Sequence, residues 1–186
     1  ICRLVPSAKR IIGLPMNVEY RALAAEGKTS HGGSPVVAIV DEAGQIKGPQ
    51  DDFYDGLTTG QGAYDDALLI IISTQAPTDG DLLSIEIDDA IRSQDPSIVL
   101  HLYEAPADAD LLDRDAWAMA NPAMGLFRSE KDIETQAQKA ERMPTSEAAF
   151  RVLFLNQRVN MTSPFVSAKV WKENSAAPLE FVGPVY

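Results

Sequence analysis

Two short, uninterrupted apolar runs constrain the fold of this chain more than any other feature of its sequence. They are VVAIV at residues 36–40 and LLIII at residues 68–72, and both are rich in β-branched side chains. Runs of this length and composition are typical of strands that are buried on both faces of a sheet. The pattern therefore predicts a mainly parallel sheet that is covered on both sides by helices.

Helical patterns alternate with these strands along the chain. Residues 81–92 place apolar side chains three or four positions apart, which is the pattern of an amphipathic helix. The same reasoning predicts a third strand at residues 97–103, and residues 20–25 could form a short strand. An alternation of this kind indicates an α/β class. Further helices are expected at residues 51–60, 113–121, 129–142 and 146–155, with a loop at residues 29–35.

The composition excludes several classes of protein. The net charge of the 186 residues is −11, which argues against an independent DNA-binding module, because such modules carry basic patches. A single cysteine, Cys2, excludes a disulfide framework and a cysteine-based zinc site, and fits a reducing setting. No apolar run approaches the roughly 20 residues of a membrane helix. The first residue is Ile rather than Met, and no signal peptide is visible.

Two carboxylates follow the first apolar run directly, in VVAIVDEAG at residues 36–44. This is the Walker B pattern, in which a buried strand delivers acidic side chains to the carboxyl end of a sheet, where α/β folds bind ligands. Asp41 would hold the Mg²⁺ that bridges nucleotide phosphates, and Glu42 would orient or deprotonate the attacking water. The alternative is an ordinary strand whose end is solvated by acidic residues.

Polar residues also follow the second apolar run, in LLIIISTQAP at residues 68–77. Ser73, Thr74 and Gln75 have hydroxyl and amide groups that can bond phosphate oxygens or the attacking water. The alternative is helix capping after a core strand. Two strands that end in this way, in this order along the chain, favour an ATPase.

The tripeptide Gly-Lys-Thr at residues 27–29 matches only the last residues of a phosphate-binding P-loop. The full pattern requires glycine five residues before Gly27, and that position is Ala22. A P-loop must also open a helix, whose first amides help to bind phosphate, and the glycines and proline of residues 32–35 leave no room for one. We therefore expect the phosphate cradle to lie upstream of this chain in a longer protein.

Five segments, in order, carry a resemblance to a known family: YRALAAEGKTSHGGSPVVAIVDEAGQ, LLIIISTQAP, DPSIVLHLYEAP, WAMANPAMG and ERMPTSEAAFRVLFLNQRV. They resemble the large subunits of phage terminases of the HK97-like type, over nearly the whole chain. The Walker B and STQ elements are moderately specific, and the ANPAMG and FRVLFLNQRV segments are less generic.

The resemblance implies the ASCE (RecA-like) fold of P-loop NTPases, a three-layer α/β architecture, here without its Walker A portion. It implies ATP and Mg²⁺ as cofactors, Asp41 as the metal ligand and Glu42 as the catalytic carboxylate. It also implies that Ser73, Thr74 and Gln75 form the motif that couples hydrolysis to movement. His31, with the following glycine, matches a recurring His-Gly of the family and is a candidate nucleotide-binding residue, although its role stays open.

The resemblance further implies a domain division and a set of partners. Residues 1–158 would be the C-terminal part of the ATPase domain, and residues 159–186 a connector towards a nuclease domain that this chain lacks. The whole protein would act on double-stranded DNA with a portal protein and a small terminase subunit, as a pentameric ring. It would work in the cytoplasm of the bacterial host, docked transiently on the procapsid and without a membrane. The chain alone is expected to bind ATP weakly and to be inactive.

Two other functions stay open at this point. One is a helicase-like ATPase core of superfamily 2, whose DEAD motif is approached by residues 41–44, DEAG; the later element is STQ rather than SAT. The other is a non-catalytic module that docks onto a portal protein or a small terminase subunit. Loss of ATP hydrolysis on replacing Glu42 separates the catalytic functions from the docking function.

Overall fold

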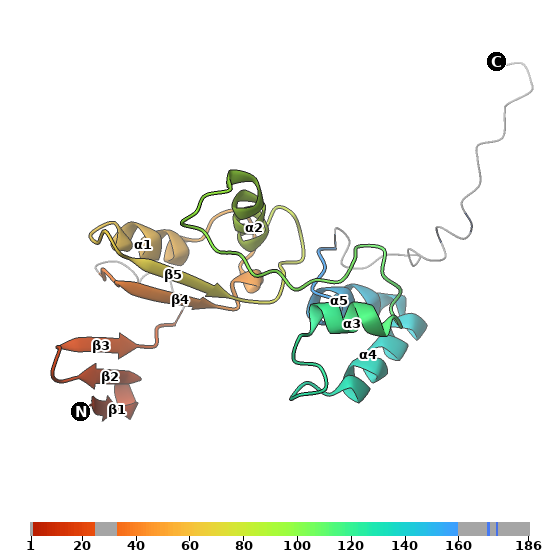
Figure 1. Cartoon of the computed structure of the whole chain (residues 1–186), viewed down its shortest axis with the longest axis horizontal. Helices are drawn as coiled ribbons and strands as arrows, with labels where there is room; N and C mark the ends of the chain where they lie inside the picture. Colours follow the sequence, from red (N-terminus) through yellow and green to blue (C-terminus); the bar gives the residue numbers. More distant parts are fainter. Residues whose placement is uncertain (1, 25–32, 160–170, 172–173, 175–186) are drawn as a thin grey trace, which may run out of the picture. The chain divides into compact units, whose positions relative to one another are not determined.

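The computed structural model describes residues 2–24, 33–159, 171 and 174. It contains two compact units, each built from two stretches of the chain (Figure 1). The first unit comprises Ile1–Asp41 and Gln50–Ile72, and the second comprises Glu42–Pro49 and Ser73–Tyr186. The chain therefore leaves the first unit after Asp41 and again after Ile72, which are the ends of the two predicted core strands.

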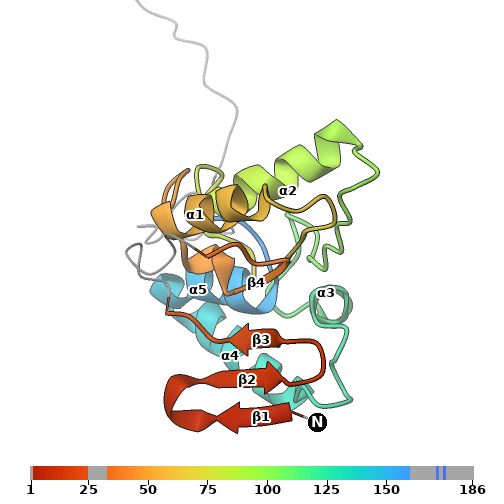
Figure 2. The same ribbon diagram turned by 90° about the vertical axis from the view of Figure 1, so that its left-hand side faces the viewer.

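The first unit opens with an antiparallel three-stranded sheet, which Figure 2 shows as a simple meander. Its strands are β1 (Cys2–Val5), β2 (Arg10–Gly13) and β3 (Val18–Arg21), with the 3-10 helix η1 (Pro6–Ala8) between the first two. Left-handed residues, Lys9 and Asn17, lie in the two connections.

This meander was not expected from the sequence, because its side chains are largely exposed and carry no buried apolar run. The short strand suggested at residues 20–25 overlaps β3 only at Tyr20 and Arg21; residues 22–24 are not a strand, and residue 25 lies outside the described part. Cross-strand pairing holds the meander together, including an ion pair between Arg10 and Glu19.

The second sheet of the first unit confirms the two predicted core strands. Strand β4 (Val37–Asp41) pairs in parallel with β5 (Leu68–Ile72), and α1 (Asp52–Gln61) lies along the pair (Figure 1). The Asp51 carboxylate caps α1 by accepting a 2.9 Å hydrogen bond from the Tyr54 amide. These elements match the predicted boundaries to within one residue.

Burial of β4 alternates, which corrects the expectation that both faces are covered. Ala38 and Val40 are buried, whereas Val37 and Ile39 are each 52% exposed. The alternation follows from the pleat, which sends successive side chains to opposite faces. Within the described residues, the parallel sheet has two strands, so the three-layer NTPase fold is not directly visible.

The third predicted strand, at residues 97–103, was wrong. The segment begins in a turn and forms no strand, and its apolar residues Ile98, Val99 and Leu100 are exposed. A strand requires a neighbour for its backbone hydrogen bonds, and no strand of the described part pairs with this segment.

Within the described residues, the second unit contains the 3-10 helix η3 (Ala43–Gln45) and four α-helices at the predicted places. Helix α4 begins after Ser129, whose hydroxyl accepts a hydrogen bond from the Asp132 amide. Helix α5 begins at Pro144 rather than at residue 146, because proline suits the first helical position. The helices are α2 (Leu82–Ser93), α3 (Arg114–Ala120), α4 (Glu130–Arg142) and α5 (Pro144–Phe154).

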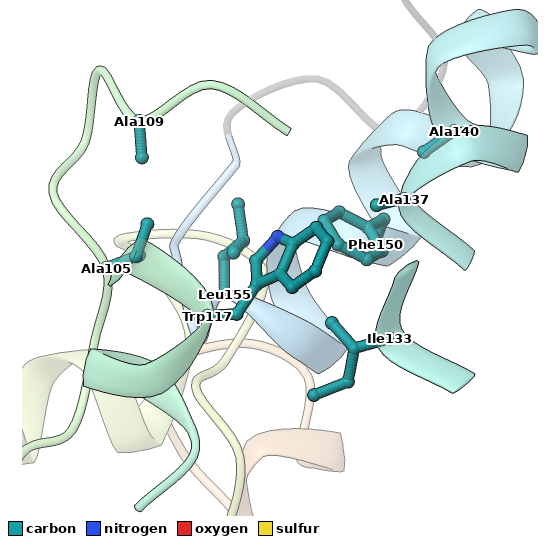
Figure 3. Packing of buried hydrophobic residues seen from close by; sticks show 9 residues of the cluster. Ala105, Ala109, Trp117, Ile133, Ala137, Ala140, Phe150 and Leu155 are labelled. Carbon is teal, nitrogen blue, oxygen red and sulfur yellow. The ribbon is translucent and has the colours of Figure 1, made fainter. Parts of the chain in front are cut away.

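The hydrophobic core of the second unit gathers around Trp117 (Figure 3). Trp117 is 1% exposed, and its indole N–H donates a 2.9 Å hydrogen bond to the Leu111 carbonyl. Phe150, Leu155 and Ile133 surround the ring in Figure 3, and alanines fill the remaining positions of this core. In the described part of the chain, no helix combines the length and the apolar character needed to cross a bilayer.

Candidate functional site

Asp41, the predicted metal ligand, is the last residue of β4. It stands opposite Ile72, the last residue of β5, in the parallel register of the first unit. The two strands therefore end together, and the residues that follow them, Glu42 and Ser73, both open stretches of the second unit. Asp41 is exposed, so its carboxylate is accessible to a hydrated cation.

Glu42 has a left-handed backbone, with φ of 57° and ψ of 36°, where it precedes η3. This conformation costs a non-glycine residue about 1–2 kcal/mol, because Cβ approaches the following carbonyl oxygen. The Glu42 carbonyl accepts a 2.9 Å hydrogen bond from the Gln45 amide, which holds the turn. Backbone strain of this kind occurs at functional sites, and in this chain it also occurs in the turns at Lys9 and Asn17.

The backbone amide of Gly44 binds Ser73, the first residue of the STQ element. Its amide donates a 2.8 Å hydrogen bond to the Ser73 hydroxyl, which in turn donates to the Thr74 carbonyl at 2.6 Å. A Cβ at position 44 would lie 2.4 Å from that carbonyl oxygen, so no residue larger than glycine fits without a shift. The loops that follow β4 and β5 therefore pack directly on each other within the second unit.

The three residues of the STQ element are in different environments. Thr74 is exposed, whereas the Ser73 hydroxyl already has two hydrogen bonds within the protein. Gln75 is only 3% exposed, and its side-chain oxygen has no hydrogen-bond partner among the described residues. Thr74 is therefore the most exposed member of the element.

Asp81 hydrogen-bonds to the loop after η3 and to the loop after β5. The sequence predicted this residue only as the start of a helix. Its carboxylate accepts hydrogen bonds from the Gly48 amide at 2.9 Å, and from the Thr78 amide and hydroxyl at 3.0 and 2.8 Å. The Gly48 N–H, followed by the Thr78 hydroxyl, holds the pKa of this buried carboxyl below its ordinary value. Asp81 thus ties the loop after η3 to the beginning of α2.

Asn156 was also missed, although it contacts the STQ element directly. Its side-chain oxygen accepts a 2.6 Å hydrogen bond from the Gln75 amide, across 81 positions of sequence. No local pattern predicts a contact at that separation; the only signal was the position of Asn156 in the FRVLFLNQRV segment of the family resemblance.

His31, and the Gly-Lys-Thr of residues 27–29, lie outside the described residues. Among the residues that are described, no three histidine, cysteine or acidic side chains come together as a metal site. Mg²⁺ in nucleotide sites needs only one or two carboxylates, because phosphates and water complete its octahedron. The exposed Asp41 carboxylate fits that requirement, whereas the Gly44 amide already donates its hydrogen bond to Ser73.

A phage terminase large subunit resembles this chain in both sequence and fold. No protein-family model matches the chain. The terminase large subunit of Enterobacteria phage HK97 is 60% identical over 179 residues, which are 96% of this chain and 36% of that protein. The crystal structure of the HK97 large terminase matches with a TM-score of 0.82 and 59% identity, over 98% of this chain and 38% of that one. Sequence and fold thus confirm that this chain resembles about a third of a phage terminase large subunit.

Proposed function

We propose that this chain contributes the Walker B and coupling elements to the ATP-driven DNA-packaging motor of a tailed phage or prophage. The whole-protein activities, which are DNA translocation and cutting, belong in this proposal to the full-length gene product. That product would act in the host cytoplasm, docked on the procapsid, with a portal protein and a small terminase subunit as partners.

One observation carries the proposal. Two parallel strands end in the same register pair, Asp41 opposite Ile72, and the loops that follow them are joined by the Gly44–Ser73 hydrogen bond. A parallel sheet brings ligand-binding residues to the carboxyl ends of its strands. The similarity to the HK97 terminase over 96% of the chain gives this arrangement its chemical interpretation.

The residues have separate roles in this proposal. Asp41 would hold Mg²⁺, which neutralises charge on the phosphates when it is bound. Glu42 would orient the attacking water and accept its proton. Its left-handed backbone sets the direction in which the side chain leaves the main chain. Thr74 would offer its hydroxyl to a phosphate oxygen or to the water.

The helicase alternative fits the structure less well. A DEAD motif places an aspartate at the fourth position, and a side chain at position 44 would collide with the Thr74 carbonyl 2.4 Å from its Cβ. The STQ loop of this chain is therefore packed on a glycine, in a way that the DEAD pattern does not permit without rearrangement.

Replacement of Asp41 tests the proposal. In the full-length gene product, Asp41→Asn should raise the Mg²⁺ concentration needed for half-maximal ATPase activity and lower kcat by at least about 100-fold, because a charged ligand is lost. The control is Asp52→Asn, which removes an exposed carboxylate of α1 and should leave both quantities unchanged. An unchanged Mg²⁺ requirement in Asp41→Asn would refute the metal role, and unchanged packaging without ATPase activity would favour the docking function.

A further inference from the structure

Asn156 follows α5 and turns the chain out of the helix. Its backbone is left-handed, with φ of 53°, a conformation that asparagine and aspartate adopt more readily than other residues with a Cβ. This turn places the side chain of Asn156 between two loops that are distant in sequence.

Both ends of the Asn156 carboxamide are engaged. Its oxygen accepts the 2.6 Å hydrogen bond from the Gln75 amide, and its nitrogen donates a 2.8 Å hydrogen bond to the Tyr103 carbonyl. An asparagine side chain has one carbonyl and one amino group, so this bridge uses both kinds of group at once. Asn156 is therefore the direct link between the STQ element and the segment that leads into the helical core.

The residues around Asn156 fix the turn to the rest of the second unit. Leu155 is completely buried in the core around Trp117, and its carbonyl accepts a 3.0 Å hydrogen bond from the Ala105 amide. On the other side, the Val159 amide donates a 2.7 Å hydrogen bond to the Pro77 carbonyl. The turn is thus anchored in the core at one end and on the loop after β5 at the other.

Arg158 extends these anchors to α2. Its guanidinium donates to the Asp88 carboxylate at 2.8 Å and to the Ser84 carbonyl at 3.2 Å. Arg158 is held between its partners with a side chain that is 19% exposed. Residues 155–159 therefore contact the helical core, α2 and the STQ loop simultaneously.

The STQ element is consequently held from two sides. Gly44 binds Ser73 on the side of the acidic loop, and Asn156 binds the Gln75 amide on the side of the helical core. Thr74, the exposed member of the element, lies between these two attachments. The Thr74 carbonyl and the Gln75 amide belong to one planar peptide unit, so a displacement of that unit acts on the bond to Asn156.

We propose that Asn156 is a positioning residue of the ATPase, which holds Gln75 so that Thr74 is correctly placed and links the movement of the STQ element to the α3–α5 core. The inference rests on the proposed function for its catalytic consequence. The essential contact is the hydrogen bond from the Gln75 amide, and the bond to Tyr103 is secondary.

Two substitutions at the same position isolate that contact. Asn156→Gly tolerates the left-handed backbone and removes both hydrogen bonds. Asn156→Asp also tolerates it, keeps an acceptor for the Gln75 amide and loses the donor to Tyr103. In the full-length gene product, Asn156→Gly should lower kcat by about 10- to 100-fold with little change in KM for ATP, as expected when a positioning contact is lost. Asn156→Asp should recover most of that loss.

A neighbouring residue supplies the control for general destabilisation. Gln157 is 6% exposed and hydrogen-bonds Arg151 and the Pro106 carbonyl, but none of its hydrogen bonds reaches the STQ element. Gln157→Ala should lower the melting temperature while leaving kcat within about twofold of the wild type, because its contacts are structural. Equal losses of kcat in Asn156→Gly and Gln157→Ala would overturn the proposal, as would equal losses in the glycine and aspartate variants.

Hydrogen exchange tests the link without relying on catalysis. In the full-length gene product, the Gln75 amide should exchange faster in Asn156→Gly than in the wild type, and Asn156→Asp should keep it protected. Unchanged exchange at Gln75 in Asn156→Gly would overturn the inference even in an active enzyme. Faster exchange in a gene product that hydrolyses no ATP would instead support the link and refute the proposed function.

Discussion

The Gly44 amide donates a 2.8 Å hydrogen bond to the Ser73 hydroxyl, and a Cβ on Gly44 would lie 2.9 Å from the same oxygen. The loop after β4 and the loop after β5 are therefore joined by a bond from a backbone amide to a side-chain hydroxyl, across 29 positions of sequence. This contact allows the position of one loop to depend on the position of the other.

Gly44→Ala should destabilise the chain by about 1–3 kcal/mol, because the new methyl group overpacks a site bounded by backbone atoms. The Thr74 carbonyl oxygen would lie 2.4 Å from the new Cβ, and it cannot move aside as a flexible side chain can. Urea denaturation monitored by tryptophan fluorescence measures the change. Gly80→Ala is the matched control, because a Cβ there meets nothing within 4 Å; equal stabilities of the two variants would contradict the packing argument.

The strained backbone of Glu42 predicts an unusual order of stabilities. Glu42→Ala keeps the unfavourable φ of 57°, whereas Glu42→Gly removes the steric cost, which is about 1–2 kcal/mol. The glycine variant also has a more flexible unfolded chain, which offsets part of this gain. We therefore expect its free energy of unfolding to exceed that of the alanine variant by roughly 1 kcal/mol. Thermal denaturation of both variants measures this difference. An alanine variant at least as stable as the glycine variant would show that the position is unstrained.

The buried Asp81 carboxylate predicts a loss of stability in acid. Because its pKa is lower in the folded chain than in the unfolded chain, its contribution is complete above the unfolded value of about 3.9. That contribution disappears as the pH falls through the lower, folded pKa. Asp88, whose pKa Arg158 lowers, adds to the same trend, so a single substitution removes only part of it.

Denaturation at several pH values measures the contribution of Asp81. Asp81→Asn should be less stable than the wild type at neutral pH, because the new amino group cannot accept hydrogen bonds from Thr78. Its stability should fall less than that of the wild type between about pH 5 and pH 3. Asp66→Asn changes an exposed carboxylate and should retain the slope of the wild type. The same slope in Asp81→Asn and the wild type would show that this carboxylate does not cause the acid sensitivity.

The isolated 186-residue chain should bind ATP weakly in the presence of Mg²⁺. Most phosphate contacts in P-loop proteins come from backbone amides of the Walker A loop, and the sequence contains no complete Walker A pattern. Isothermal titration calorimetry measures the affinity, with the full-length gene product as the positive control. Tight, Mg²⁺-dependent binding by the chain alone would contradict this account.

Local patterns predicted the elements that depend on local causes. The apolar runs gave β4 and β5, and the cap at Ser129 with the periodicity after it gave α4. The segment at residues 97–103 has the same apolar character but pairs with no strand of the described part, because pairing depends on a neighbour rather than on composition. The β1–β3 meander is the opposite case, because the sequence did not predict it. Its strands form through pairing with one another, without a buried apolar face.

The residues of the candidate site also fall into two groups, those recognised from local sequence and those whose role depends on distant contacts. Asp41 and the STQ element were visible as candidates in the sequence, because they are polar residues that follow core strands. Gly44, Asp81 and Asn156 were not, because each acts through a contact with a loop that lies 29 to 81 positions away. Their importance comes from the space and the donors that the folded loops leave, which no local pattern encodes.

The central claim, that Glu42 activates water in an ATPase, is tested most directly by single-turnover hydrolysis with Glu42→Gln in the full-length gene product. The substitution keeps the size of the side chain and removes its ability to accept a proton. We predict that ATP binding stays within about threefold of the wild type while the hydrolysis rate falls by at least about 100-fold. Hydrolysis at the rate of the wild type, with ATP bound equally well, would contradict the claim.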